Sequence, residues 1–194
     1  MTTITRSARV GLKDVHYALV TSDDSTGVVY GTPVGFAGAM TAKITSQNDQ
    51  ATQYDDDGPS EAAFSRGNVT LELKMRDLDV DTQAVLMGHT VTNGVQIENS
   101  SDVPPYVAIG FRSLKANGKY RYVWLLKGQF VEPDDEFETK GEKIAFHNAT
   151  LKATFVKTAY NGNVEAKTDE DMTGFVAATA TGWFTSVVYK ASAA

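Results

Sequence analysis

The chain has 194 residues, with 24 Asp and Glu against 18 Lys and Arg, for a formal net charge of -6. This length fits one domain with a substantial core, and the lack of cysteine excludes disulfide scaffolds, thiol catalysis and Cys-ligated metal sites. The acidic balance argues against general nucleic-acid binding, which needs a basic face. Sixteen glycines and many threonines indicate a β-rich chain with many turns.

Neither the start of the chain nor its longest uncharged stretch predicts a targeting or membrane segment. Residues 1–20 are polar and no apolar run follows their basic side chains, so they do not predict a secretory signal. Residues 172–189 carry no charge, but their threonines and glycines make them too polar for a membrane helix. We therefore expect no membrane contact.

The first half of the chain predicts strands separated by a long polar segment. Residues 28–34 and 37–46 are predicted strands. Residues 46–66 contain few large apolar side chains and predict a projecting loop that is functional or is ordered by a partner. Residues 69–76 alternate in polarity, which is the clearest strand pattern in the chain. Its apolar face comprises Val69, Leu71, Leu73 and Met75.

One short helix is predicted over residues 80–87. Asp79 or Asp81 can cap its start, because a carboxylate accepts hydrogen bonds from the free amide groups there and its charge favours a helix N-terminus. Gly88 can end the helix, since glycine readily takes the left-handed conformation of a C-terminal cap.

A hairpin is predicted around Asn117-Gly118. We expect these two residues to form a type I′ turn, in which both central residues have positive φ. The flanking strands each place large side chains on one face. These are Val107, Ile109 and Phe111 before the turn, and Tyr120, Tyr122 and Trp124 after it.

The last part of the chain is less regular. Residues 143–157 predict a strand in which the apolar phase shifts, and a β-bulge at residues 147–149 would absorb the extra residue. After about residue 160 we expect a C-terminal arm that is free to move, in which the spacing of Trp183 and Val187 favours helix. The whole chain, residues 1–194, is then a single mainly β domain. We expect a β-sandwich or partial barrel with one short flanking helix and a long projecting loop.

The sequence contains no motif that predicts catalysis or tight metal binding. His16, His89 and His147 do not belong to a His-x-x-x-His pair or an HExxH motif, so each is expected to be structural or to lie on the surface, although distant residues can still converge in space. A nucleophile elbow and a phosphate-binding loop are also lacking. We therefore predict no catalytic, cofactor-binding or metal residue, no cofactor and no enzymatic activity.

Two further features have a functional and a structural interpretation. The acidic runs at residues 55–57, 134–136 and 169–171 could each hold calcium or magnesium weakly, but solvated loops are commoner. Pairs of them could serve a carboxylate-based hydrolase, which needs a convergence that sequence spacing does not show. The aromatic strand of the predicted hairpin could be a stacking platform for sugar or single-stranded nucleic acid, whereas period-two aromatics more often form a core or an interface.

Several segments, in matching order over most of the chain, resemble one family. The most specific is Pro104-Pro105-Tyr106, which leads into the hairpin with Gly118-Lys119-Tyr120. The full set covers residues 10–18, 86–89, 104–111, 117–124, 139–144 and 183–184. Together they are similar to the major tail protein, or tail tube subunit, of long non-contractile-tailed bacteriophages.

The resemblance implies a structural virion protein. Its subunits would form rings, commonly of six, that stack into the tail tube, a channel for genome delivery into the host. Sheets of neighbouring subunits would join edge to edge, and the long loop would bridge stacked rings. The implied partners are copies of the same chain together with tape measure, tail terminator and distal tail proteins, with DNA passing through the lumen without specific binding. The implied location is the virion, after assembly in the bacterial host cytoplasm.

The residues themselves are consistent with self-assembly and leave one main alternative. Open sheet edges invite pairing with another chain, and a ring closes such edges by symmetry. Carboxylates that face a lumen would repel the phosphates of DNA. The alternative is a β-sandwich module that binds carbohydrate or another ligand through Tyr120, Tyr122 and Trp124.

Overall fold

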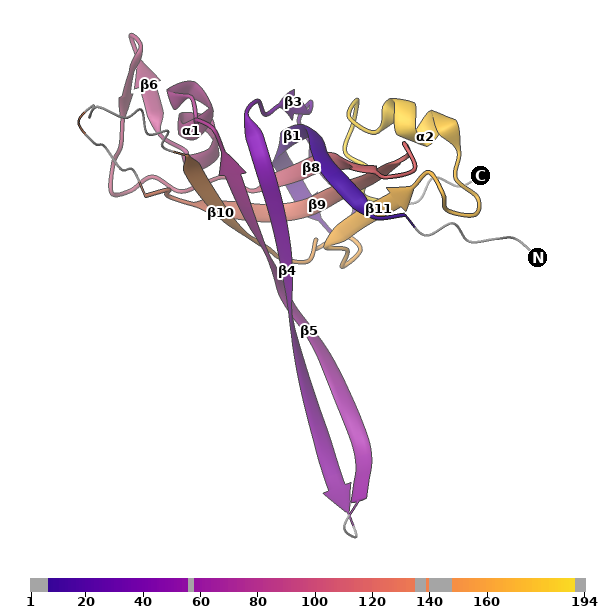
Figure 1. Ribbon diagram of the computed structural model, residues 1–194. Helices are drawn as coiled ribbons and strands as arrows, with labels where there is room; N and C mark the ends of the chain where they lie inside the picture. Colours follow the sequence, from indigo (N-terminus) through magenta and orange to yellow (C-terminus); the bar gives the residue numbers. More distant parts are fainter. Residues whose placement is uncertain (1–6, 56–57, 135–138, 140–147, 191–194) are drawn as a thin grey trace.

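The computed structural model describes residues 7–55, 58–134, 139 and 148–190 (Figure 1). Two helices and eleven strands occur in the described residues. In chain order they are β1 (Arg9–Asp24), β2 (Gly27–Tyr30), β3 (Val34–Gly35), β4 (Ala39–Asp55), β5 (Gly58–Met75), α1 (Val80–Met87), β6 (Thr90–Thr92), β7 (Val95–Ile97), β8 (Val107–Lys115), β9 (Tyr120–Val131), β10 (Ala149–Phe155), β11 (Glu165–Asp169) and α2 (Ala177–Gly182). The predicted mainly β fold is confirmed.

Nine strands form one large antiparallel sheet, and β6 and β7 form a separate two-stranded sheet. The main order is β2-β1-β8-β9-β10-β5-β4, with β3 paired to β1 and β11 paired to β9. Within the described residues, the end strands β2 and β4 each pair on one side only, so the large sheet is not closed into a barrel.

Several predicted elements are confirmed in detail. The alternating run at the end of β5 buries its four apolar side chains to 1% exposure or less. Helix α1 has the predicted bounds, with the Asp79 carboxylate accepting from the Thr82 amide at 2.8 Å. Gly88 ends it at φ 79°. The predicted strand over residues 143–157 corresponds to β10, while residues 143–147 lie outside the described residues.

The predicted type I′ turn is wrong at Asn117-Gly118, where Gly118 alone of the two residues has a positive φ. The Gly118 amide donates to the Lys115 carbonyl at 3.0 Å and the Lys115 amide to the Lys119 carbonyl at 2.8 Å. This is a type I turn followed by a left-handed glycine, the usual three-residue hairpin loop. The double positive φ occurs instead in the β6–β7 hairpin, at Asn93-Gly94.

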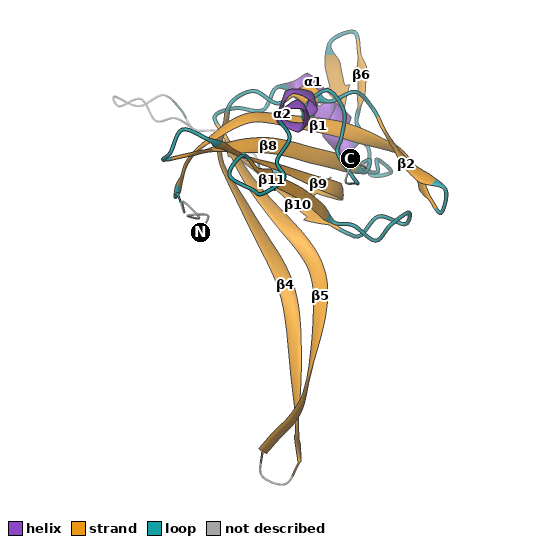
Figure 2. Ribbon diagram, turned by 90° about the vertical axis from the view of Figure 1, so that its right-hand side faces the viewer, coloured by secondary structure: helices purple, strands orange, loops and turns teal. Residues whose placement is uncertain are grey.

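The segment predicted as a projecting loop over residues 46–66 does project, but as paired strands rather than as a loop. The outer halves of β4 and β5 pair from Asn48 with Arg66 to Asp55 with Gly58. They extend away from the rest of the molecule as a two-stranded ribbon (Figures 1 and 2). A shift in register lies between Ser46 and Asn48, where the ribbon leaves the sheet.

Two apolar cores lie on opposite faces of the central strands. On the larger one, side chains of β1, β5, β8, β9 and β10 meet Leu86 and Met87 of α1. On the other face, Trp124 and its neighbours are covered by Trp183 and Val187 from the C-terminal segment. The Trp124 indole also donates to the Trp183 carbonyl at 2.9 Å.

The C-terminal segment, predicted as an arm after about residue 160, packs on the sheet. It adds β11 beside β9 and then forms α2, a second helix, which lies before the residues 183–187 whose spacing favours helix. Trp183 follows this helix and does not form part of it. The burial of Trp183 and Val187, at 2% and 6% exposure, holds the segment in place.

Two glycines allow aromatic rings to lie directly on neighbouring strands. Gly110 of β8 is opposite Trp124 of β9, and Gly128 of β9 is opposite Phe155 of β10. A Cβ atom added at either glycine would lie 2.6 Å from an atom of the facing ring. Trp124 and Phe155 belong to opposite cores. Each face of the sheet therefore has one aromatic ring packed directly on a glycine of the neighbouring strand.

We expect Gly110→Ala to lower the free energy of unfolding by about 1–3 kcal/mol, because the new methyl group overpacks the Trp124 ring. Urea denaturation followed by tryptophan fluorescence measures the loss. Gly27→Ala is the matched control, since a Cβ there meets nothing within 4 Å. Equal stability of the two variants would contradict the steric role of Gly110.

Candidate functional site

The projecting ribbon is the first candidate site. Its outer eight residues on β4 extend about 25 Å at the usual rise of a strand. The side chains described there, including Asn48, Gln50, Thr52 and Arg66, are exposed. Phe64 is 76% exposed and pairs across the ribbon with Gln50. A large aromatic ring exposed on a ribbon that extends away from the core makes the ribbon a candidate contact surface for a partner.

The two ends of the large sheet are the second candidate surface. Strands β2 and β4 present an outer row of backbone groups without a neighbouring strand among the described residues. Val29 on β2 and Met40 on β4 are 55% and 54% exposed. Such edges are templates for pairing with another chain unless something covers them.

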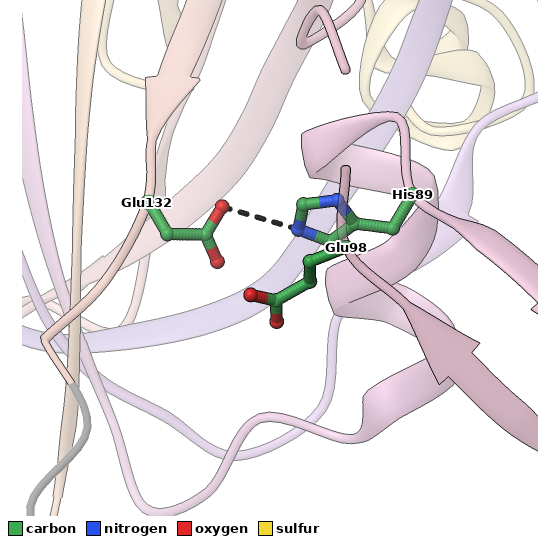
Figure 3. Close-up of side chains that lie close together, drawn as sticks. All are labelled: His89, Glu98 and Glu132. Carbon is green, nitrogen blue, oxygen red and sulfur yellow. Dashed lines mark hydrogen bonds and ion pairs between the residues drawn. The ribbon is translucent and has the colours of Figure 1, made fainter. Parts of the chain in front are cut away.

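The third candidate is a group of side chains that the sequence analysis missed. His89, Glu98 and Glu132 each offer a ligand atom, and these atoms lie within 4.8 Å of one another (Figure 3). Each residue comes directly after a regular element, namely α1 with its cap, β7 and β9. We call these three residues the His89 cluster.

Local backbone geometry places His89 in this cluster. Gly88 takes a left-handed conformation, and a Cβ on it would lie 2.5 Å from the Val103 carbonyl oxygen. Only glycine therefore lets the chain turn here against the loop that follows β7. The His89 amide still donates to the Ala84 carbonyl at 2.9 Å, which ties the histidine to the end of the helix.

The imidazole of His89 is held from both sides. Its Nδ1 lies 2.8 Å from Asp102 Oδ2, and its Nε2 lies 3.1 Å from Glu132 Oε2. The Asp102 carboxylate also accepts from the Asn99 amide at 2.9 Å. On the other side, Gln83 of α1 donates to the second oxygen of Glu132 at 3.0 Å. The ring and both of its contacting carboxylates are thus fixed by further hydrogen bonds.

Burial and charge act in opposite directions on His89, whose side chain is 6% exposed. Burial alone would lower the pKa of the imidazole. The hydrogen bond with Asp102 and the negative charge of Glu132 outweigh burial, so the pKa of His89 lies above its ordinary value. The surroundings therefore favour a positive charge at Nε2, and either a proton or a metal ion can supply it.

The cluster borders a cavity of about 550 Å³. Phe130 and Met87 form part of its apolar wall, and Asp102, Glu98 and Glu132 form part of its polar wall. Within the described part of the chain, this is the one group of three His, Cys, Asp or Glu side chains with ligand atoms close enough for a metal ion. The residues lie 9 to 43 positions apart in the sequence, so no short motif could reveal them.

The other histidines and acidic runs have different surroundings. His16 stacks on Phe184, with ring centroids 4.5 Å apart, which agrees with a structural role. His147 and most of the acidic runs at residues 55–57 and 134–136 lie outside the described residues.

The acidic run at residues 169–171 forms an ion-pair network rather than a solvated loop. Lys115, 4% exposed, donates to Asp169 at 2.9 Å and also to Asp171. Arg121 donates to Asp169 at 2.8 Å, and Lys119 lies 2.9 Å from Asp171. Because these carboxylates already have cationic partners, the network closes the β8–β9 hairpin onto β11 and leaves little capacity for calcium or magnesium.

The aromatic strand does not form an exposed platform. Tyr122 is 3% exposed and Trp124 is fully buried, because the C-terminal segment covers them. Tyr120 is partly exposed. Two of the three rings proposed for ligand stacking are therefore part of the core.

Comparison with known proteins gives no assignment. No model of a known protein family matches the chain, and no curated protein matches it either. Among the helices of the described residues, none has the length and apolar character to cross a membrane.

We expect Asp169→Asn to lower the free energy of unfolding by about 1–3 kcal/mol at pH 7, because the buried Lys115 ammonium loses a charged partner. Burial acts to raise the pKa of Asp169, but hydrogen bonds from Lys115 and Arg121 outweigh it, so that pKa is lowered. The contribution of a carboxylate with a lowered pKa is complete above its unfolded pKa, about 3.9, and disappears as the pH falls through the folded value.

The difference between wild type and Asp169→Asn should therefore shrink as the pH falls from 5 to below 3. Urea denaturation over this range measures it. Asp134→Asn, which removes an exposed carboxylate, controls for the change in net charge. A difference that is independent of pH would contradict the ion-pair role.

Proposed function

We propose that this chain is a structural subunit that self-assembles into stacked rings, which form the tail tube of a long non-contractile-tailed bacteriophage. The tube would deliver the genome into the host, and the protein would reside in the virion. The resemblance in sequence suggests this assembly, and the projecting ribbon is the observation that carries it. No reaction is assigned to the chain.

The ribbon supports the proposal because none of its described side chains contributes to a core of the single molecule. The inner half of β5 belongs to the sheet, where it supplies the core with Val69, Leu71, Leu73 and Met75. Its outer half extends beyond that core (Figure 1), and the exposed Phe64 would gain burial against another molecule. In a tube, this ribbon would reach the adjacent ring.

The open ends of the sheet support lateral contact. An interface in which the β2 end of one subunit meets the β4 end of the next is head-to-tail, and it closes into a ring when the rotation between subunits divides a full turn. Such a ring would satisfy the unpaired backbone groups of both edges. Rings of six are the form that the family resemblance implies.

The charge of the chain is suited to a passive channel. A net charge of -6 would repel DNA phosphates where the carboxylates face the lumen. Tape measure, tail terminator and distal tail proteins remain the proposed partners inside the tube and at its ends. The ligand-binding alternative has less support, because Tyr122 and Trp124 are buried.

Replacing residues 48–66 by an Asn-Gly turn tests the proposal. The variant should fold, since none of the described side chains among the replaced residues belongs to either core, but it should not form tubes. Sedimentation velocity and negative-stain electron microscopy at rising protein concentration measure assembly, with circular dichroism to verify folding. Wild-type chain that binds a glycan as a stable monomer, or normal tubes from the shortened chain, would contradict the proposal.

We expect Phe64→Ala to raise the concentration required for assembly at least tenfold, because a buried aromatic ring is worth more than about 1.4 kcal/mol at an interface. Val103→Ala is the matched control, since Val103 is 72% exposed but lies beside Gly88 at the end of α1 and not on the ribbon. The thermal stability of the monomer should be unchanged in both variants. Identical assembly of the two would exclude Phe64 from the contact between rings.

A further inference from the structure

We propose that the His89 cluster is a zinc site in which His89 Nε2, Glu98 and Glu132 bind the metal ion. The site does not depend on the assembly function proposed above. It differs from the acidic runs of the chain in having a nitrogen ligand, and its carboxylates lack a Lys or Arg partner among the described residues. Imidazole with carboxylates suits zinc, whereas calcium and magnesium prefer oxygen ligands alone.

The distances are compatible with this ion. Tetrahedral zinc with bonds of about 2.0–2.2 Å separates its ligand atoms by about 3.4 Å. His89 Nε2 and Glu132 Oε2 are 3.1 Å apart, and the third ligand atom lies within 4.8 Å of them. Glu98 is exposed, so its side chain can move the short distance that closes the site. The adjacent cavity gives room for a water molecule as fourth ligand.

Asp102 has the role of a positioning residue. Its carboxylate accepts from Nδ1 of His89 at 2.8 Å, which fixes the tautomer that leaves the lone pair of Nε2 facing Glu132. Histidine ligands of zinc almost always donate their other ring N–H in this way, and loss of the acceptor typically weakens metal binding 10–100-fold. This contact therefore holds the imidazole in the orientation that zinc binding requires.

The site would connect three parts of the chain. Glu98 follows the β6–β7 hairpin, His89 follows α1, and Glu132 follows β9 of the large sheet (Figure 3). The β6–β7 hairpin is a separate two-stranded sheet with exposed Val91, Val95 and Ile97, so it has little core of its own. Zinc bound at its base would fasten it to the large sheet.

Isothermal titration of the untagged, metal-free chain with zinc chloride at pH 7.5 tests the site. We expect one zinc per chain, with binding weakened at least tenfold in Glu132→Gln and in His89→Gln, and about tenfold or more in Asp102→Asn. Asp134→Asn is the matched control, because it removes an exposed carboxylate two residues from Glu132 and should bind zinc like wild type. Magnesium at the same concentration should not compete.

Two further measurements keep the test decisive if a variant folds poorly. Glu98→Gln changes an exposed side chain and should also weaken binding with an unchanged circular dichroism spectrum. Zinc should slow hydrogen exchange of residues 90–97 in wild type but not in Glu98→Gln. Absence of zinc binding by wild type at 100 µM would overturn the site. Equal affinity of Glu132→Gln and Asp134→Asn would overturn it too.

Discussion

The hairpin of β8 and β9 carries large apolar side chains on both faces, and the arrangement of the rest of the molecule follows from the need to bury both. On β9, Val123 and Leu125 face the larger core while Tyr122, Trp124 and Leu126 face the smaller one. Full burial of one such side chain is worth about 1.5–3 kcal/mol. On the face of the larger core, its side chains pack with those of β1, β5 and β10 and with α1. On the other face, the C-terminal segment covers them. This segment is therefore required for the fold, although few of its residues are in regular structure.

Burial of the central hairpin also explains why other parts of the sheet can remain open. The core requires only the last part of β5, with Val69 to Met75, so the outer half of that strand is free to be polar. The end strands β2 and β4 likewise each have a neighbouring strand on one side only within the described residues. A stable monomer and an unfinished sheet are thus compatible, which is the combination that a self-assembling subunit needs.

Local chemistry determined what could be predicted from the sequence. Alternation at the end of β5 and the caps of α1 depend on residues close together in the chain, so the buried face of that strand and the bounds of α1 are as predicted, while β5 itself starts earlier, at Gly58. The Asn-Gly pairs show the limit of this approach, because Asn93-Gly94 forms the type I′ turn and Asn117-Gly118 does not. The length of the loop and the pairing of the flanking strands determine the turn type in each hairpin. The Asn-Gly dipeptide alone does not determine either.

The His89 cluster could not be predicted for a related reason. Its members are brought together by the ends of α1, β7 and β9, and only the fold places these ends side by side. The one local signal is Gly88, which both ends the helix and permits the close approach of Val103. Likewise, the polar segment of residues 46–66 has the composition of a loop, and its strand pairing extends outward from the pairing of the buried half of β5, with a shift in register between Ser46 and Asn48.

The strand pairing of this segment bears directly on its suitability for assembly. A flexible loop of similar length would lose backbone entropy on binding, at a cost of roughly 1–2 kcal/mol for each residue that becomes fixed. In the ribbon, cross-strand hydrogen bonds have already restricted the backbone, and the direction of the ribbon is inherited from β4 and β5. A smaller part of the favourable contact free energy is then offset by the loss of backbone entropy on binding. A modest contact through Phe64 and its polar neighbours can therefore hold two molecules together when it is repeated around a ring.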